Sequence, residues 1–182
     1  MEDRQAVVDQ LVGNSHGDID VVRTILDQHP DLVEERATWG ESPLDAAAQM
    51  GRKDIAKLLM ERGAKPDFFA LVMLGELERV REELDRDPEL IHGRGVHELS
   101  PLYFAAAGDH PELAELLLER GADVNQGSPA AYPIHAAVMW ARVSLVQRYL
   151  AAGADPGVRD FENRTARELA ESVKRPEVAG LL

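Results

Sequence analysis

Two segments of this chain repeat each other at an offset of 58 residues. Residues 17–64 and 75–122 share 20 identities in 48 aligned positions. The identical runs include Ser42-Pro43-Leu44 with Ser100-Pro101-Leu102, and Glu61-Arg62-Gly63-Ala64 with Glu119-Arg120-Gly121-Ala122. Such self-similarity is typical of repeat proteins, in which each copy buries its apolar face against the next. The chain is therefore expected to fold as a stack of small units.

Each repeated block contains two smaller units. The residues aligned as the starts of second helices are spaced by 34, 24, 34, 32 and 33 positions, and they are Gly17, Gly51, Gly75, Asp109, Ala141 and Lys174. The short spacing indicates that the connection between Ala64 and Asp67 has lost about ten residues. We therefore expect the unit that follows to lack its leading turn, which would leave a notch in the row of turns.

Each unit has the residues of a helix–turn–helix. Ser42 is a good helix cap and Pro43 suits the first turn, where a missing N–H costs nothing. Gly51 then separates the alanine-rich first helix from a second helix with an apolar stripe, which comprises Ile55, Leu58 and Leu59. Gly63 stands where a left-handed residue ends a helix.

These motifs resemble the ankyrin-repeat family, whose pattern is roughly G-x-T-P-L-H-x-A-A, with a closing G-A-D-V-N. The matching runs are Gly40-Glu41-Ser42-Pro43-Leu44-Asp45, Ser100-Pro101-Leu102-Tyr103, Gly121-Ala122-Asp123-Val124-Asn125, Tyr132-Pro133-Ile134-His135, Gly153-Ala154-Asp155-Pro156 and a worn Asn163-Arg164-Thr165-Ala166. The Pro-Asp-Leu and Pro-Glu-Leu extensions after two second helices resemble those of small bacterial ankyrin proteins.

The resemblance implies an all-α ankyrin-repeat solenoid, a stack of helix–turn–helix units with β-turn fingers between them. It implies one domain over residues 1–182. The expected units are about 4–36, 37–65, 66–94, 95–126, 127–158 and 159–182, and unit 66–94 is the one that lacks its finger. In the family, the His of T-P-L-H bonds to backbone between repeats. His135 alone holds that position here, and we expect it and His110 to be structural.

The charge and composition exclude several classes of function. The chain has 33 acidic and 20 basic residues, a formal net charge of −13, and no cysteine. Phosphate backbones would repel it, so we expect no nucleic-acid partner. No apolar stretch reaches the ~18 residues of a membrane-spanning helix, so we expect no membrane association and a cytoplasmic location.

The acidic residues are unevenly distributed. Residues 1–65 carry a net charge of −5, residues 66–123 carry −9 and residues 124–182 carry +1. A partner drawn by this charge would present a basic surface to the first two thirds of the chain. The alternative is that these are solvated helix faces that keep the protein soluble.

Enzyme motifs are incomplete. His97-Glu98-Leu99 begins like a zinc-protease motif, but Pro101 stands where the second His is required. Gly93-Arg94-Gly95 begins like a dinucleotide loop, without a preceding strand or a third Gly. His92 and His97 could share a metal, although a third ligand is not evident. We expect no enzyme, no catalytic residue, no cofactor and no metal.

The remaining candidate is a protein-binding surface. The resemblance implies that finger positions and the ends of first helices contact partners. The candidate residues are Trp39, Glu41, Gln49, Met50, His97, Leu99, Met139, Trp140, Phe161, Glu162 and Arg164. Of these, Trp39, Met50, Trp140 and Phe161 are expected as apolar anchors, and Glu41, His97, Glu162 and Arg164 as a polar rim. Met73, Leu74 and Met139 could instead pack inside.

The predicted function is a non-enzymatic protein–protein interaction module that binds its partner on a concave groove. One alternative is a homo-oligomeric, self-assembling protein that uses Phe68-Phe69 and Leu181-Leu182. A second is an accessory to an enzyme that depends on a ligand or metal. We expect a monomer rather than a homodimer.

Overall fold

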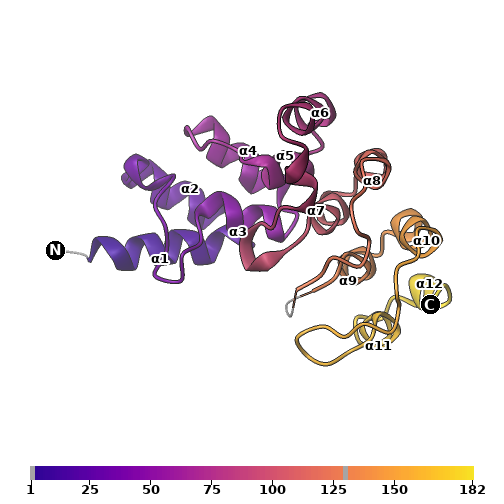
Figure 1. Cartoon of the computed structure of the whole chain (residues 1–182). Coiled ribbons are helices and arrows are strands. Elements are labelled where there is room, and N and C mark those ends of the chain that lie inside the picture. The colour runs from indigo at the N-terminus through magenta and orange to yellow at the C-terminus, as the bar shows by residue number, and fades with distance from the viewer. Residues whose placement is uncertain (1–2, 129–130) are drawn as a thin grey trace.

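The computed structural model describes residues 3–128 and 131–182, which form an elongated stack of helix pairs with the two ends of the chain far apart (Figure 1). The described residues contain helices and no strand. The helices are α1 (Arg4–Ser15), α2 (Ile19–Gln28), α3 (Pro43–Gln49), α4 (Lys53–Glu61), α5 (Phe68–Leu74), α6 (Leu77–Arg86), α7 (Pro101–Gly108), α8 (Pro111–Glu119), α9 (Pro133–Met139), α10 (Val143–Ala151), α11 (Ala166–Ser172) and α12 (Pro176–Ala179). This arrangement is the predicted all-α solenoid; the unit boundaries stay a prediction.

The helices begin where their capping residues stand. The Ser42 hydroxyl accepts a hydrogen bond from the Asp45 N–H, and the Asp45 carboxylate accepts one from the Ser42 N–H. Thr165 and Glu168 form the same reciprocal pair at the start of α11. Because each pair satisfies two N–H groups that the helix leaves open, the cap defines where the helix begins.

Each second helix begins two residues later than we aligned it. Five of the six aligned positions are left-handed linkers, and they are Gly51, Gly75, Asp109, Ala141 and Lys174. The left-handed residue turns the chain between the two helices of a pair, and the helix starts after it. At Gly51 the glycine is also needed for space, because a Cβ there would collide with the carbonyl oxygen of Ala107.

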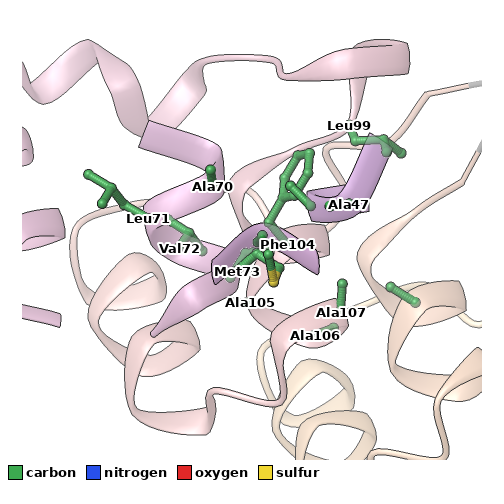
Figure 2. Packing of buried hydrophobic residues seen from close by; sticks show 14 of the residues in the cluster. Ala47, Ala70, Leu71, Val72, Met73, Leu99, Phe104, Ala105, Ala106 and Ala107 are labelled. Atoms are coloured by element: carbon green, nitrogen blue, oxygen red, sulfur yellow. The ribbon is translucent and has the colours of Figure 1, made fainter. Parts of the chain in front are cut away.

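The first helices pack on one another along the stack: α1 on α3, α3 on α5, α5 on α7, α7 on α9 and α9 on α11. Figure 2 shows small side chains in this layer, including Ala70 on α5 and Ala105 on α7, where they let the helices approach closely. Val72, Met73 and Phe104 fill the space between α5 and α7. Met73 is therefore a core residue. Leu74 is only partly buried and packs against that core.

The connection into α5 has no finger, as predicted. Asp67 caps α5 directly by accepting a hydrogen bond from the Ala70 N–H at 2.8 Å. As a result, α3 also contacts α7 past α5, and the fingers at 36–42 and 94–99 become neighbours. Between them lies a hollow of about 310 Å³. The expected notch is therefore bridged, because His97 of one finger lies 3.3 Å from Glu41 of the other.

The second helices are joined by ion pairs from one pair of helices to another. Arg62 contacts Asp27 at 2.7 Å, and Arg120 contacts Asp85 at 2.9 Å. Exposed pairs of this kind contribute only about 0–1 kcal/mol each. Because the Asp27 and Asp85 side chains are exposed, they belong to the solvated surface of the second helices. The longest described helix has 12 residues, and none in the described part of the chain could cross a membrane.

Candidate functional site

Fingers and first helices together line a groove of about 480 Å³. Eight of the eleven candidate residues lie in this groove: Gln49, Met50, His97, Leu99, Met139, Trp140, Phe161 and Arg164. Trp39 and Glu41 line the adjoining hollow between the first two fingers, which shares His97 with the groove. Glu162 contacts Arg164 at the far end. Positions more than 100 residues apart in the sequence thus form one surface.

The walls of the groove are large apolar side chains. Met50, Met139 and Phe161 are 41%, 39% and 71% exposed, so solvent covers apolar area that a partner could bury. Met139 is thus surface rather than core. Leu99 is buried and offers a partner little area.

Trp140 connects the groove to the core through a series of rings. Its indole packs edge-on against Tyr103, with ring centroids 5.9 Å apart and planes at 81°. Tyr103 contacts Phe104, Phe104 contacts Phe69, and Phe69 contacts Phe68, with centroid separations of 5.4–5.7 Å. Three of the four ring contacts are edge-to-face, an arrangement that aromatic rings favour, and the Phe69–Phe104 pair is tilted at 45°. The Trp140 ring therefore rests on a row of packed rings that leads into the core.

Glu41 is buried, in contrast to its expected place on the polar rim. Its side chain is 2% exposed and accepts hydrogen bonds from the Trp39 indole N–H, at 2.8 Å, and from the Gln49 amide. His16 and His97 approach it to 3.4 and 3.3 Å. One carboxylate thus holds side chains from the α1–α2 turn, from two fingers and from α3. We call these five residues the Glu41 network.

The contacts within the Glu41 network favour the charged forms of Glu41 and His16. Burial raises the pKa of Glu41, but hydrogen bonds from His16 and Trp39 outweigh it, and the pKa lies below its usual value. The hydrogen bond to Glu41 raises the pKa of His16 above its usual value, against the opposing effect of burial. Each partner therefore stabilises the charge of the other.

The far end of the groove holds a second buried carboxylate. The Arg164 guanidinium donates to Asp160 through two nitrogens, at 3.0 and 2.8 Å, and contacts Glu162 at 2.6 Å. Burial raises the pKa of Asp160, but the hydrogen bonds from Arg164 outweigh it and the pKa is lowered. The positive charge of Arg164 is therefore neutralised within its own finger.

Comparison with known proteins identifies the repeat. The ankyrin-repeat family model matches residues 39–69 and 97–128, which hold two of the fingers and the first helices after them. The chain contains ankyrin repeats. An ankyrin repeat and SAM domain-containing protein from Mus musculus is 30% identical over 122 residues, 64% of this chain and 14% of that protein.

Two other relatives align with 115 and 166 residues of this chain. Alpha-latrocrustotoxin-Lt1a from Latrodectus tredecimguttatus is 28% identical over 115 residues, 59% of this chain and 8% of the toxin. An ankyrin repeat and KH domain-containing protein from Caenorhabditis briggsae is 26% identical over 166 residues, 86% of this chain and 6% of that protein. The chain spans less than a fifth of the length of each relative. Ankyrin repeats indicate a protein–protein interaction module, and the family is typically non-enzymatic.

The ankyrin histidine position has its expected role. The Tyr132 N–H donates to Nδ1 of His135 at 3.4 Å, and the opposite nitrogen, Nε2, lies 3.2 Å from the Arg164 carbonyl oxygen. This arrangement requires a neutral ring that donates from Nε2, and burial lowers the pKa of His135 accordingly. His110 bridges to the Met73 carbonyl oxygen at 3.0 Å, and burial also lowers its pKa.

Sequence reasoning missed His16, Tyr103 and Asp160 as parts of the site. His16 precedes an aligned helix start and has no motif of its own, and its partner Glu41 is 25 positions away. Asp160 had a detectable signal, since it stands four residues before Arg164 in an ankyrin finger, where the two side chains can pair. Within the described residues, no three His, Asp or Glu side chains are placed to share a metal ion.

Proposed function

We propose that this ankyrin-repeat chain binds another protein along the groove formed by its fingers and first helices, and that it acts through this contact without catalysing a reaction. The observation that carries the proposal is the row of exposed apolar side chains on one groove, Met50, Met139 and Phe161, with Trp140 beside them. Aromatic residues and Met are enriched where protein interfaces bury their cores.

The rigidity of the groove supports the same proposal. Trp140 rests on Tyr103, and the Glu41 network holds Trp39, Gln49 and His97. A partner would therefore meet Trp140, Gln49 and His97 already held in place, while Met50 and Met139 can still adapt to it. Each rotamer-rich side chain that needs no immobilisation saves about 0.5–1.5 kcal/mol of binding free energy.

The self-assembly alternative has less support. Phe68 is buried and Phe69 packs against Phe104, so this pair is not an open face for a second copy. Leu181 and Leu182 are partly buried against the helices of their own chain. We therefore retain the monomer as the proposed state, to be checked by light scattering at several protein concentrations.

Affinity capture tests the proposal. The bait is the full chain, and cells that produce it supply the lysate. Met50→Glu and Phe161→Glu each place a charge on the groove, whereas Val143→Glu makes the same change at an exposed apolar residue of α10 outside it. We expect a captured protein to be lost with either groove variant and kept with Val143→Glu. Capture that both groove variants leave unchanged would refute groove binding.

A further inference from the structure

We propose that the groove accepts a short protein segment whose contact face carries a few large uncharged apolar side chains and whose flanks carry Lys or Arg. This inference rests on the proposed function and specifies the partner. It follows from three properties of the groove: the charges along it, its size and apolar walls, and the charge at its edges.

The charged side chains along the groove are already paired. Asp160 and Arg164 bind each other, and His97 faces the Glu41 carboxylate. A charged group inserted between Met139 and Phe161 would lose its hydration without gaining a free counter-charge, which is costly. The central part of the occupant is therefore uncharged.

The size of the groove suits a few side chains and not a whole protein face. Its volume of about 480 Å³ lies within the roughly 300–1,000 Å³ of pockets that hold a drug-sized molecule, which is room for a few side chains. Met50 and Met139 adapt their shape to what they contact, because the thioether chain is unbranched and flexible. The occupant is expected to insert apolar anchors spaced along one face of a helix or an extended segment.

Trp140 favours a polypeptide over another apolar molecule. Its indole N–H makes no hydrogen bond with the residues that the structure describes, although the ring itself is held by Tyr103. An indole N–H next to an apolar surface can donate to a backbone carbonyl of a docked segment. A peptide backbone carries a carbonyl acceptor at every residue, whereas a purely apolar molecule carries none.

The edges of the groove are negative. Glu98 and Glu162 stand on the two fingers that flank it, with side chains 73% and 51% exposed. Glu98 lies 3.9 Å from Arg94, a loose pair. At the other end the single guanidinium of Arg164 faces two carboxylates, Asp160 and Glu162. Because Glu98 is only loosely paired and Arg164 is outnumbered by carboxylates, these edges attract basic residues on either side of an apolar contact.

A displayed library of random peptides of about 12 residues, long enough for anchors over two helical turns, tests the inference on the full chain. We expect the recovered peptides to be enriched in Trp, Phe, Leu and Met, and to carry more Lys and Arg than Asp and Glu. A synthetic copy of one recovered peptide should bind Met139→Glu or Phe161→Glu at least about tenfold more weakly. It should bind Val143→Glu as it binds the unmodified chain.

The double variant Glu98→Gln, Glu162→Gln tests the charge at the edges. We expect it to weaken the same peptide about two- to tenfold and to reduce the salt dependence of binding. Each variant is first compared with the unmodified chain by circular dichroism and thermal unfolding, and both carboxylates are exposed, so the fold should tolerate their loss.

The outcomes separate the inference from the proposed function. Peptides that need the groove but are acidic, polar or indifferent to the Glu98→Gln, Glu162→Gln change would overturn the inference and leave groove binding intact. Recovery of no peptides, or of peptides that neither Met139→Glu nor Phe161→Glu weakens, would count against both.

Discussion

The indole N–H of Trp39 donates a 2.8 Å hydrogen bond to the carboxylate of Glu41, a side chain that is 2% exposed. The rest of the Trp39 ring is about half exposed. An exposed aromatic side chain is thus held by a buried acid, and the same acid contacts His97 of the next finger. The orientation of one finger therefore depends on the other through a single carboxylate.

Replacing Glu41 by Gln should destabilise the fold by about 1–3 kcal/mol, because the amide cannot accept from Trp39, Gln49 and His16 with the strength of a carboxylate. Urea unfolding followed by circular dichroism measures the change, and Trp fluorescence reports the loss of Trp39 ordering. The matched control is Glu98→Gln, an exposed carboxylate on the next finger, which should change stability by less than about 0.5 kcal/mol. Equal losses of stability in Glu41→Gln and Glu98→Gln would show that Glu41 contributes no more to the fold than an exposed carboxylate does.

The His16–Glu41 pair should stabilise the fold most between about pH 4.5 and 6.5. The pKa of His16 is raised above 6.5, so its contribution is complete below 6.5 and is lost as pH rises through the folded-state value. The pKa of Glu41 is lowered below 4.5, so its contribution is lost as pH falls through the folded-state value. The stability difference between the unmodified chain and His16→Gln should be largest in that window and shrink above it.

Only the difference in stability between the unmodified chain and His16→Gln isolates the contribution of the His16–Glu41 pair. His110 and His135 have lowered pKa values, and they destabilise the unmodified chain as pH falls below 6.5. Unfolding both proteins by urea at a series of pH values provides the comparison. A difference that stays constant, or grows toward alkaline pH, would contradict the raised pKa of His16.

Two linker positions should respond in opposite directions to opposite substitutions, because removing a Cβ relieves a left-handed alanine at Ala141 and adding a Cβ creates a clash at Gly51. Ala141 has φ of 52°, so Ala141→Gly should stabilise the chain by up to about 1 kcal/mol by removing a left-handed alanine. Gly51 has φ of 64° and lies against the Ala107 carbonyl, so Gly51→Ala should cost at least about 2 kcal/mol. Thermal unfolding midpoints should move up and down respectively; parallel shifts would be inconsistent with this geometry.

Tyr149 joins the layer of second helices to the layer of first helices through a buried hydrogen bond. Its hydroxyl donates to the Leu102 carbonyl oxygen at 2.6 Å, from α10 to α7. Tyr149→Phe removes this buried hydrogen bond and should destabilise the fold by about 0.5–1.5 kcal/mol. Tyr132→Phe, at a partly exposed ring, is the control and should have little effect on the urea midpoint.

The sequence predicted those features that depend on a local pattern. Ser42 was predicted as the cap of the helix that begins at Pro43, and the structure adds the returning carboxylate of Asp45. The structural role of His135 was predicted from the resemblance, because this residue holds the His position of the ankyrin T-P-L-H pattern in Tyr132-Pro133-Ile134-His135. The second copy of this cap differs from the first. Ser100 aligns with Ser42, but Tyr103 stands where Asp45 returns its carboxylate. The Ser100 hydroxyl makes no hydrogen bond with any described residue.

The features that were not predicted depend on distances between units. Glu41 was expected on a rim because finger residues of ankyrin repeats usually face solvent. Its burial follows from the loss of the next finger, which brings His97 and the finger at 94–99 against it. No local pattern around Glu41 records that loss, since the missing residues lie more than 20 positions further along the chain.

Direct contact between α3 and α7 changes how the array should come apart. Repeat arrays in which each unit touches only its neighbours unfold piecewise, and their stability is close to a sum of unit and interface terms. Here α3, before the shortened unit, also touches α7, after it, and Gly51 in the linker that follows α3 lies against Ala107 of α7. Because this contact links the two halves of the array past α5, we expect them to unfold together in one transition rather than piecewise.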